Sequence, residues 1–85
     1  MFFEAEFKPS KKMKYNKEAK SLSGKQIAVQ EGWTINEGPF AGQQCFYIPN
    51  TNIGWIPACD LKGLTLISFS KWKTMQKTLG LSEEK

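Results

Sequence analysis

The sequence contains no histidine and no arginine, although it is rich in lysine. Without histidine there can be no Ser-His or Cys-His catalytic pair and no histidine ligand for a metal. The seven glycines are scattered along the chain rather than gathered in a phosphate-binding loop. We therefore expect no enzymatic activity, no cofactor, no metal and no small-molecule substrate.

Long apolar runs and cysteines are also scarce. No apolar run approaches the roughly 20 residues needed to span a bilayer, and the initial Met1-Phe2-Phe3 leads directly into Glu4 rather than into a secretory signal. The two cysteines, Cys45 and Cys59, form no metal-ligand or disulfide pattern. We expect a cytoplasmic protein without a membrane partner, in which both thiols are reduced; a single Cys45–Cys59 disulfide is the alternative.

The charge of the chain is unevenly distributed. All twelve basic residues are lysines and the net charge is +4. Seven lysines lie between Lys8 and Lys25, where Glu18 is the single acid, whereas residues 26–61 contain three acids and no lysine. Such a basic segment attracts phosphates or acidic protein surfaces over a Debye length of about 8–10 Å. The alternative is a solvated, mobile loop that serves solubility.

Short apolar segments separated by turn residues predict one mainly β domain over residues 1–69. Phe3, Ala5 and Phe7 alternate with charged residues, which predicts a half-buried first strand. Residues 9–25 lack periodicity and are predicted to form a long loop. Further strands are expected over residues 24–35, with a bulge at Gly32, and over residues 44–48, 53–56 and 64–69. Pro57 should end the fourth strand and begin a short 3₁₀ turn, because proline cannot continue a central ladder.

The chain after residue 69 has the pattern of an amphipathic helix. Ser70 is a suitable N-cap, and Trp72, Met75 and Leu79 share one stripe of a helix. Gly80 suits the position that follows a helix. We predict a C-terminal helix over residues 70–81 and a frayed tail over residues 82–85.

The segment GWIPACDL, from Gly54 to Leu61, resembles the G-[YW]-[IV]-P-x-x-x-[VL] ending of SH3 domains. FFEAEF and GKQIAV resemble the first strand and the segment that follows the first loop, so the resemblance covers residues 2–67. It implies a small five-stranded SH3-like β-barrel with the helix appended. EGPFAGQ, from Glu37 to Gln43, is similar to part of the KOW motif, which also belongs to SH3-like barrels.

The sequence departs from SH3 domains that bind proline-rich peptides. The tyrosine expected three residues after the proline is Asp60, and Cys45-Phe46-Tyr47 replaces the tryptophan pair of the third strand. The first loop, acidic in many peptide-binding SH3 domains, is rich in lysine. We therefore expect an anionic partner, nucleic acid or an acidic protein surface, in place of a proline-rich peptide.

The first functional hypothesis is binding of nucleic acid backbone through the loop at residues 9–25. Lysines would contact phosphates and a tyrosine among them would stack on a base. The residues predicted for this role are Lys11, Lys12, Lys14, Tyr15, Lys17 and Lys20. Without arginine, sequence-specific reading of guanine is not expected, and the binding should be salt-sensitive.

The second hypothesis is a protein-binding adaptor or inhibitor, of the kind by which phages and mobile elements block a host enzyme. It would use an exposed aromatic patch, because aromatic residues dominate interface hot spots. The candidates are Trp33, Phe40, Tyr47 and Trp72. Each could instead pack in the core. Trp33 and Phe40, beside a turn-rich loop, are expected to be exposed, whereas Trp55 is expected in the core.

Overall fold

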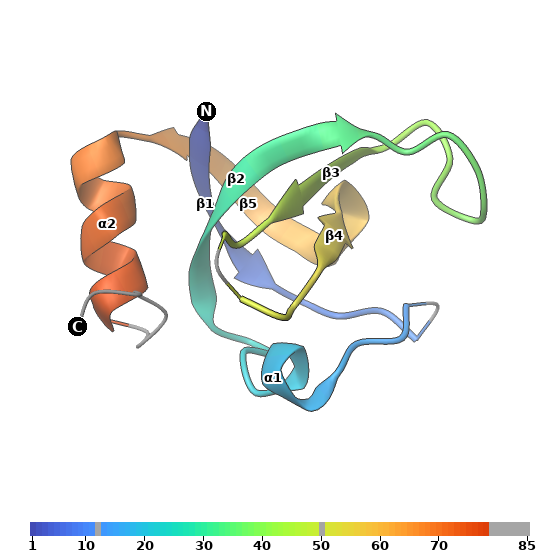
Figure 1. Ribbon diagram of the computed structural model, residues 1–85, viewed down its shortest axis with the longest axis horizontal. Helices are drawn as coiled ribbons and strands as arrows, with labels where there is room; N and C mark the ends of the chain where they lie inside the picture. Colours follow the sequence, from blue (N-terminus) through green and yellow to red (C-terminus); the bar gives the residue numbers. More distant parts are fainter. Residues whose placement is uncertain (12, 50, 79–85) are drawn as a thin grey trace.

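The computed structural model describes residues 1–11, 13–49 and 51–78 (Figure 1). In chain order the elements are β1 (Phe2–Phe7), α1 (Lys17–Lys20), β2 (Gln26–Thr34), β3 (Gln44–Tyr47), β4 (Trp55–Pro57), the 3₁₀ turn η1 (Ala58–Asp60), β5 (Leu61–Ile67) and α2 (Phe69–Thr78). The predicted mainly β chain with five strands and a C-terminal helix is confirmed. The predicted helical ending at Leu79 and Gly80 lies outside the described residues.

The five strands form one antiparallel sheet in the order β4-β3-β2-β1-β5. In this pairing β4 and β5 are the two ends of the sheet, which is therefore not closed by backbone hydrogen bonds. β2 is the longest strand and curves across the middle of the molecule (Figure 1). Its register against β3 shifts between Glu31 and Thr34, around Gly32. A Cβ on Gly32 would lie 3.0 Å from Cys45 Sγ, so the strands approach closely at the predicted bulge.

One main core fills the inner side of the curved sheet. Phe7, Ile27, Val29 and Ile56 are fully buried there. They come from β1, β2 and β4, and period-two alternation turns their polar neighbours outward. The ends of the sheet thus share one apolar cluster, although they are not paired with each other.

The strand boundaries differ from the prediction by one to three residues, most clearly in β4 and β5. β4 includes Pro57, which pairs with Cys45 before the 3₁₀ turn begins. β5 begins at Leu61, three residues earlier than predicted. Gly63, at φ +71°, lies within the strand near the register shift between Glu4 and Glu6, so it marks a bulge.

Helix α2 covers the outer face of β1 and β2. The ring of Trp72 lies 4.8 Å from that of Phe2, and Lys71 Nζ lies 2.7 Å from Glu4 Oε2. Ser68 Oγ accepts a hydrogen bond from Lys71 N at 3.2 Å, so Ser68 acts as the N-cap in place of the predicted Ser70. Within the described residues, no helix has the length and apolarity that crossing a membrane requires.

Candidate functional site

The segment from residue 9 to residue 25, here called the lysine-rich loop, folds more tightly than its sequence predicts. It contains α1, which Asn16 caps by accepting a hydrogen bond from Ala19 N at 2.8 Å. Tyr15, Ala19 and Leu22 are buried and belong to the main core. The predicted long loop thus contains one short helix, and these three apolar residues fasten it to the sheet. Lys12 lies outside the described residues.

Asp60 is the polar anchor of the lysine-rich loop. Its side chain is 1% exposed, and its Oδ2 accepts hydrogen bonds from Tyr15 OH at 2.6 Å and from Ser10 N and Oγ at 3.1 and 3.2 Å. Cys59 Sγ donates to Oδ1 at 3.4 Å. A buried carboxylate is tolerated when donors surround it in this way. Asp60 thus ties the loop to the 3₁₀ turn.

Tyr15 is not available as an exposed stacking residue. Its ring packs edge-on against Phe7, with 5.1 Å between ring centroids, and its hydroxyl is turned toward Asp60. Burial, followed by the hydrogen bond and negative charge of Asp60, raises the pKa of Tyr15 well above its usual value near 10. The stacking role predicted for Tyr15 is incompatible with this burial, and its role is structural.

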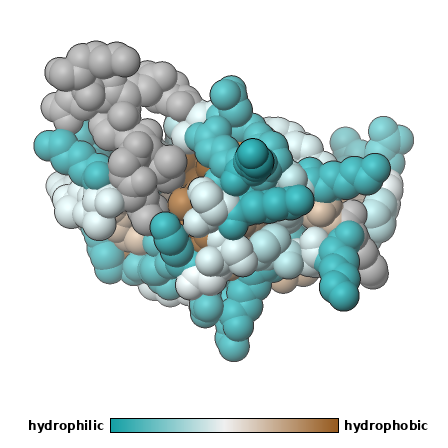
Figure 2. Space-filling view, turned by 90° about the horizontal axis from the view of Figure 1, so that it is seen from below, coloured by the Kyte–Doolittle hydropathy of each residue, from teal (hydrophilic) through white to brown (hydrophobic). Residues whose placement is uncertain are grey.

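The described lysines of the lysine-rich loop all point to solvent. They are Lys11, Lys14, Lys17, Lys20 and Lys25. Among the residues that the structure describes, the ion pairs are Lys8–Glu6 at 3.9 Å and Lys71–Glu4 at 2.7 Å, so none involves a lysine of the loop. Figure 2, seen from the side of α1, shows several long hydrophilic side chains projecting from this face. The loop therefore presents positive charge that no carboxylate of the described residues neutralises.

The four aromatic residues predicted as a patch do not form one. Trp33 is 53% exposed, as expected, and Tyr47 is half-buried. The expectation that Phe40 is exposed is wrong, because it is only 6% exposed and packs with Ile35 and Cys45 in a second apolar cluster. Trp72 lies on α2, where its ring packs against Phe2 of β1 and Phe69 of the same helix instead of joining Trp33 and Tyr47.

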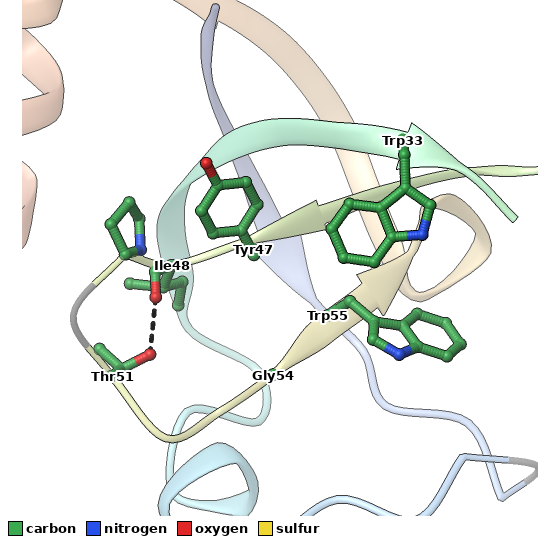
Figure 3. A pocket seen from close by; sticks show the side chains of 7 residues that line it. Trp33, Tyr47, Ile48, Thr51, Gly54 and Trp55 are labelled. Atoms are coloured by element: carbon green, nitrogen blue, oxygen red, sulfur yellow. Dashed lines mark hydrogen bonds between the residues drawn. The ribbon is translucent and has the colours of Figure 1, made fainter.

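The structure instead places Trp33 and Tyr47 in a groove with Trp55 (Figure 3). The groove, here called the aromatic groove, has a volume of about 470 Å³ and is lined by Trp33, Tyr47, Ile48, Pro49, Thr51, Gly54 and Trp55. Tyr47 and Trp55 are directly paired across β3 and β4, so they share one face of the sheet. Trp55 was expected in the core; it is half-buried, packs against the second apolar cluster and also lines the groove. Its position on the outer face follows from alternation with its buried neighbour Ile56.

The lysine-rich loop and the aromatic groove meet at one hydrogen bond. Asn16 Nδ2 donates to Asn52 O at 2.7 Å. Asn52 lies between Thr51 and Gly54, which both line the groove, and Asn16 lies between Lys14 and Lys17. The basic loop therefore borders one end of the groove.

Side chains suited to metal binding do not gather in the described part of the chain. No cluster of three or more His, Cys, Asp or Glu side chains occurs within residues 1–11, 13–49 and 51–78. Cys45 is buried and Cys59 exposed, and both are free thiols. The chemistry that the arrangement offers is a positively charged rim beside an aromatic surface.

Comparison of the chain with protein-family models, with curated proteins and with solved structures returned no match.

Proposed function

We propose that the protein is a non-catalytic SH3-like domain that binds nucleic acid backbone through its lysine-rich loop. The main support for this proposal is that the loop is fixed to the core while its described lysines remain exposed and form none of the ion pairs found among the described residues. The side chains of Tyr15, Ala19 and Leu22 are buried in the main core and anchor the loop there. A loop kept only for solubility would not need three buried anchors.

The proposed SH3-like barrel rests on several features of the chain. A long loop follows β1, a 3₁₀ turn precedes β5, and GWIPACDL spans β4 and that turn. β2 bends around Gly32, so both ends of the sheet contribute to one core cluster. These are the properties expected of a small, strongly curved sheet whose side chains fill the interior.

Lysine suits a partner that is recognised by its charge. Its ammonium group acts as a point charge and binds phosphates without the fixed geometry of arginine. Binding through several lysines releases counterions, so the affinity falls steeply as salt rises. The sequence of the nucleic acid should matter little, because phosphate contacts carry no base information.

Two variants of equal net charge test the proposal. The first combines Lys14→Gln with Lys17→Gln in the lysine-rich loop, and the control combines Lys62→Gln with Lys73→Gln on β5 and α2, where both lysines are exposed. Binding of labelled single-stranded and double-stranded DNA is measured by fluorescence anisotropy at about 50 mM salt. The loop variant should bind several-fold more weakly than the control. Equal losses in the two variants would mean that net charge, and not the loop, governs binding.

A protein partner is the second candidate, favoured by the exposure of Trp33. Of the four aromatic residues first considered, Trp33 and Tyr47 line the aromatic groove. A protein interface centred on aromatic residues loses much less affinity with salt than phosphate contacts do. Retention of a protein partner at high salt, lost on Trp33→Ala, would favour this candidate.

A further inference from the structure

The aromatic groove offers flat apolar surfaces on the outer face of β2, β3 and β4. Trp33 is more than half exposed, and Tyr47 and Trp55 remain partly exposed beside it (Figure 3). Tryptophan and tyrosine rings on an open sheet face are the groups on which unpaired bases stack, and such stacking tolerates any base sequence. This apolar surface lies on the outside of the sheet, so the main core does not use it.

Protein contacts hold the ring of Trp55 and the backbone of Trp33 in place before any ligand binds. The ring of Trp55 is supported by the buried Phe40, whose centroid lies 6.4 Å away in an edge-on arrangement. Tyr47 pairs with Trp55 across the strands. Trp33 N donates to Cys45 Sγ at 3.4 Å, which fixes the backbone at the bulge. A preformed site loses little conformational entropy on binding.

Lysines lie beside the groove at the end formed by the connection between β3 and β4. Asn16 is hydrogen-bonded to Asn52 of the β3–β4 connection. Lys17 follows Asn16 directly, so their Cα atoms are about 3.8 Å apart. Lys14 precedes Asn16 by two residues, and both lysines are exposed. A strand with its bases in the groove can therefore bring its phosphates to these lysines.

Glu31, the acidic residue of β2, does not place negative charge in the aromatic groove. Glu31 pairs with Phe46, the neighbour of Tyr47. Successive side chains of a strand point to opposite faces, so Glu31 and Tyr47 lie on different faces of the sheet. The aromatic groove is thus apolar on its floor and basic at its rim, which complements a chain of bases joined by phosphates.

We propose that the aromatic groove stacks unpaired bases of a single-stranded nucleic acid while Lys14 and Lys17 hold its phosphates. The inference rests on the proposed function and narrows it to single strands, since bases paired inside a duplex cannot reach Trp33, Tyr47 and Trp55. The lysine-rich loop supplies the salt-sensitive part of the affinity, and the groove supplies a part that depends on the bases.

The test compares ligands that differ only in their bases. Labelled oligothymidine of about 12 nucleotides, within the span covered by small binding folds, is titrated beside an abasic strand of the same length and a duplex. The protein variants are Trp33→Ala and Tyr47→Ala. The control is Phe69→Ala, which removes an aromatic side chain of similar exposure from α2. Thermal unfolding checks that each variant is folded.

The wild-type protein should bind oligothymidine about 5- to 100-fold more tightly than the abasic strand, from the usual strength of base stacking. Trp33→Ala and Tyr47→Ala should reduce this advantage and leave binding of the abasic strand and the duplex unchanged. Phe69→Ala should behave as the wild type.

Three results would overturn the inference. Equal affinity for oligothymidine and the abasic strand would exclude base stacking and leave the lysine-based function intact. A base advantage that survives both groove variants would place the bases elsewhere. Absence of binding to all three ligands at low salt would overturn the inference together with the proposed function, and the groove would then be a candidate protein-docking surface.

Discussion

Replacing Tyr15 with phenylalanine removes one hydroxyl and tests how the lysine-rich loop is held. The ring can keep its contact with Phe7, whereas Asp60 loses the hydrogen bond of 2.6 Å that Tyr15 OH donates to it. A hydrogen bond to a charged group contributes about 1.5–3 kcal/mol, and a buried carboxylate with fewer donors retains its desolvation cost. We expect Tyr15→Phe to lower the free energy of unfolding by about 2 kcal/mol.

The loss of stability in Tyr15→Phe should be easy to measure, because the free energy of unfolding of a domain of this size is only about 4–13 kcal/mol. Urea unfolding followed by tryptophan fluorescence should show a lower midpoint with an unchanged slope. The matched control is Tyr47→Phe, which removes a hydroxyl from a half-buried ring that lines the aromatic groove. It should change the free energy of unfolding by about 0.5 kcal/mol or less. Equal effects of the two variants would refute the assignment of Tyr15 and Asp60 as the anchor of the loop.

Three further predictions follow from the packing. Phe40→Ala should lower the free energy of unfolding, measured with urea, by about 3–5 kcal/mol, because the ring is buried. Trp33→Ala should lower it by about 0.5 kcal/mol or less, because that ring is exposed. The reverse order would contradict the placement of the two rings. Gly32→Ala should lower the free energy of unfolding by about 1–3 kcal/mol, because the added Cβ would lie 3.0 Å from Cys45 Sγ and 3.1 Å from the Cys45 carbonyl oxygen. An unchanged melting temperature would count against this close approach. Because the pKa of Tyr15 is raised, the free energy of unfolding should fall above about pH 10, where the unfolded chain releases the Tyr15 hydroxyl proton and the folded protein keeps it. Urea midpoints measured between about pH 9 and 11 should show this fall, and it should be weaker in Tyr15→Phe.

Local rules predicted the parts of the fold that depend on neighbours in the sequence. Alternation placed Phe7 on the inner face of the first strand, and the fixed φ of Pro57 placed the 3₁₀ turn directly after β4. Gly32 was correctly expected at a bulge, because a glycine inside a strand pattern often marks close approach of another backbone.

The candidate site was harder to predict because it depends on contacts between distant residues. Tyr15 packs in the main core and donates a hydrogen bond to Asp60, which lies 45 positions further along the chain. Phe40 lies in a segment rich in turn residues, but the segment folds back over Ile35 and Cys45. The aromatic groove combines three strands, and only their register shows that Tyr47 and Trp55 share a face.

If phosphates bind to the lysine-rich loop, the affinity must depend on salt in a way that the loop lysines control. The affinity for oligothymidine is measured by fluorescence anisotropy at several concentrations between about 50 and 200 mM salt, for the wild type and for the Lys14→Gln, Lys17→Gln double variant. Each phosphate contact contributes about 0.7 to the slope of log affinity against log salt for a single strand. We expect a steep wild-type slope that becomes shallower by about 1.4 in the double variant. An affinity that does not change with salt, or a slope that the two substitutions leave unaltered, would contradict it.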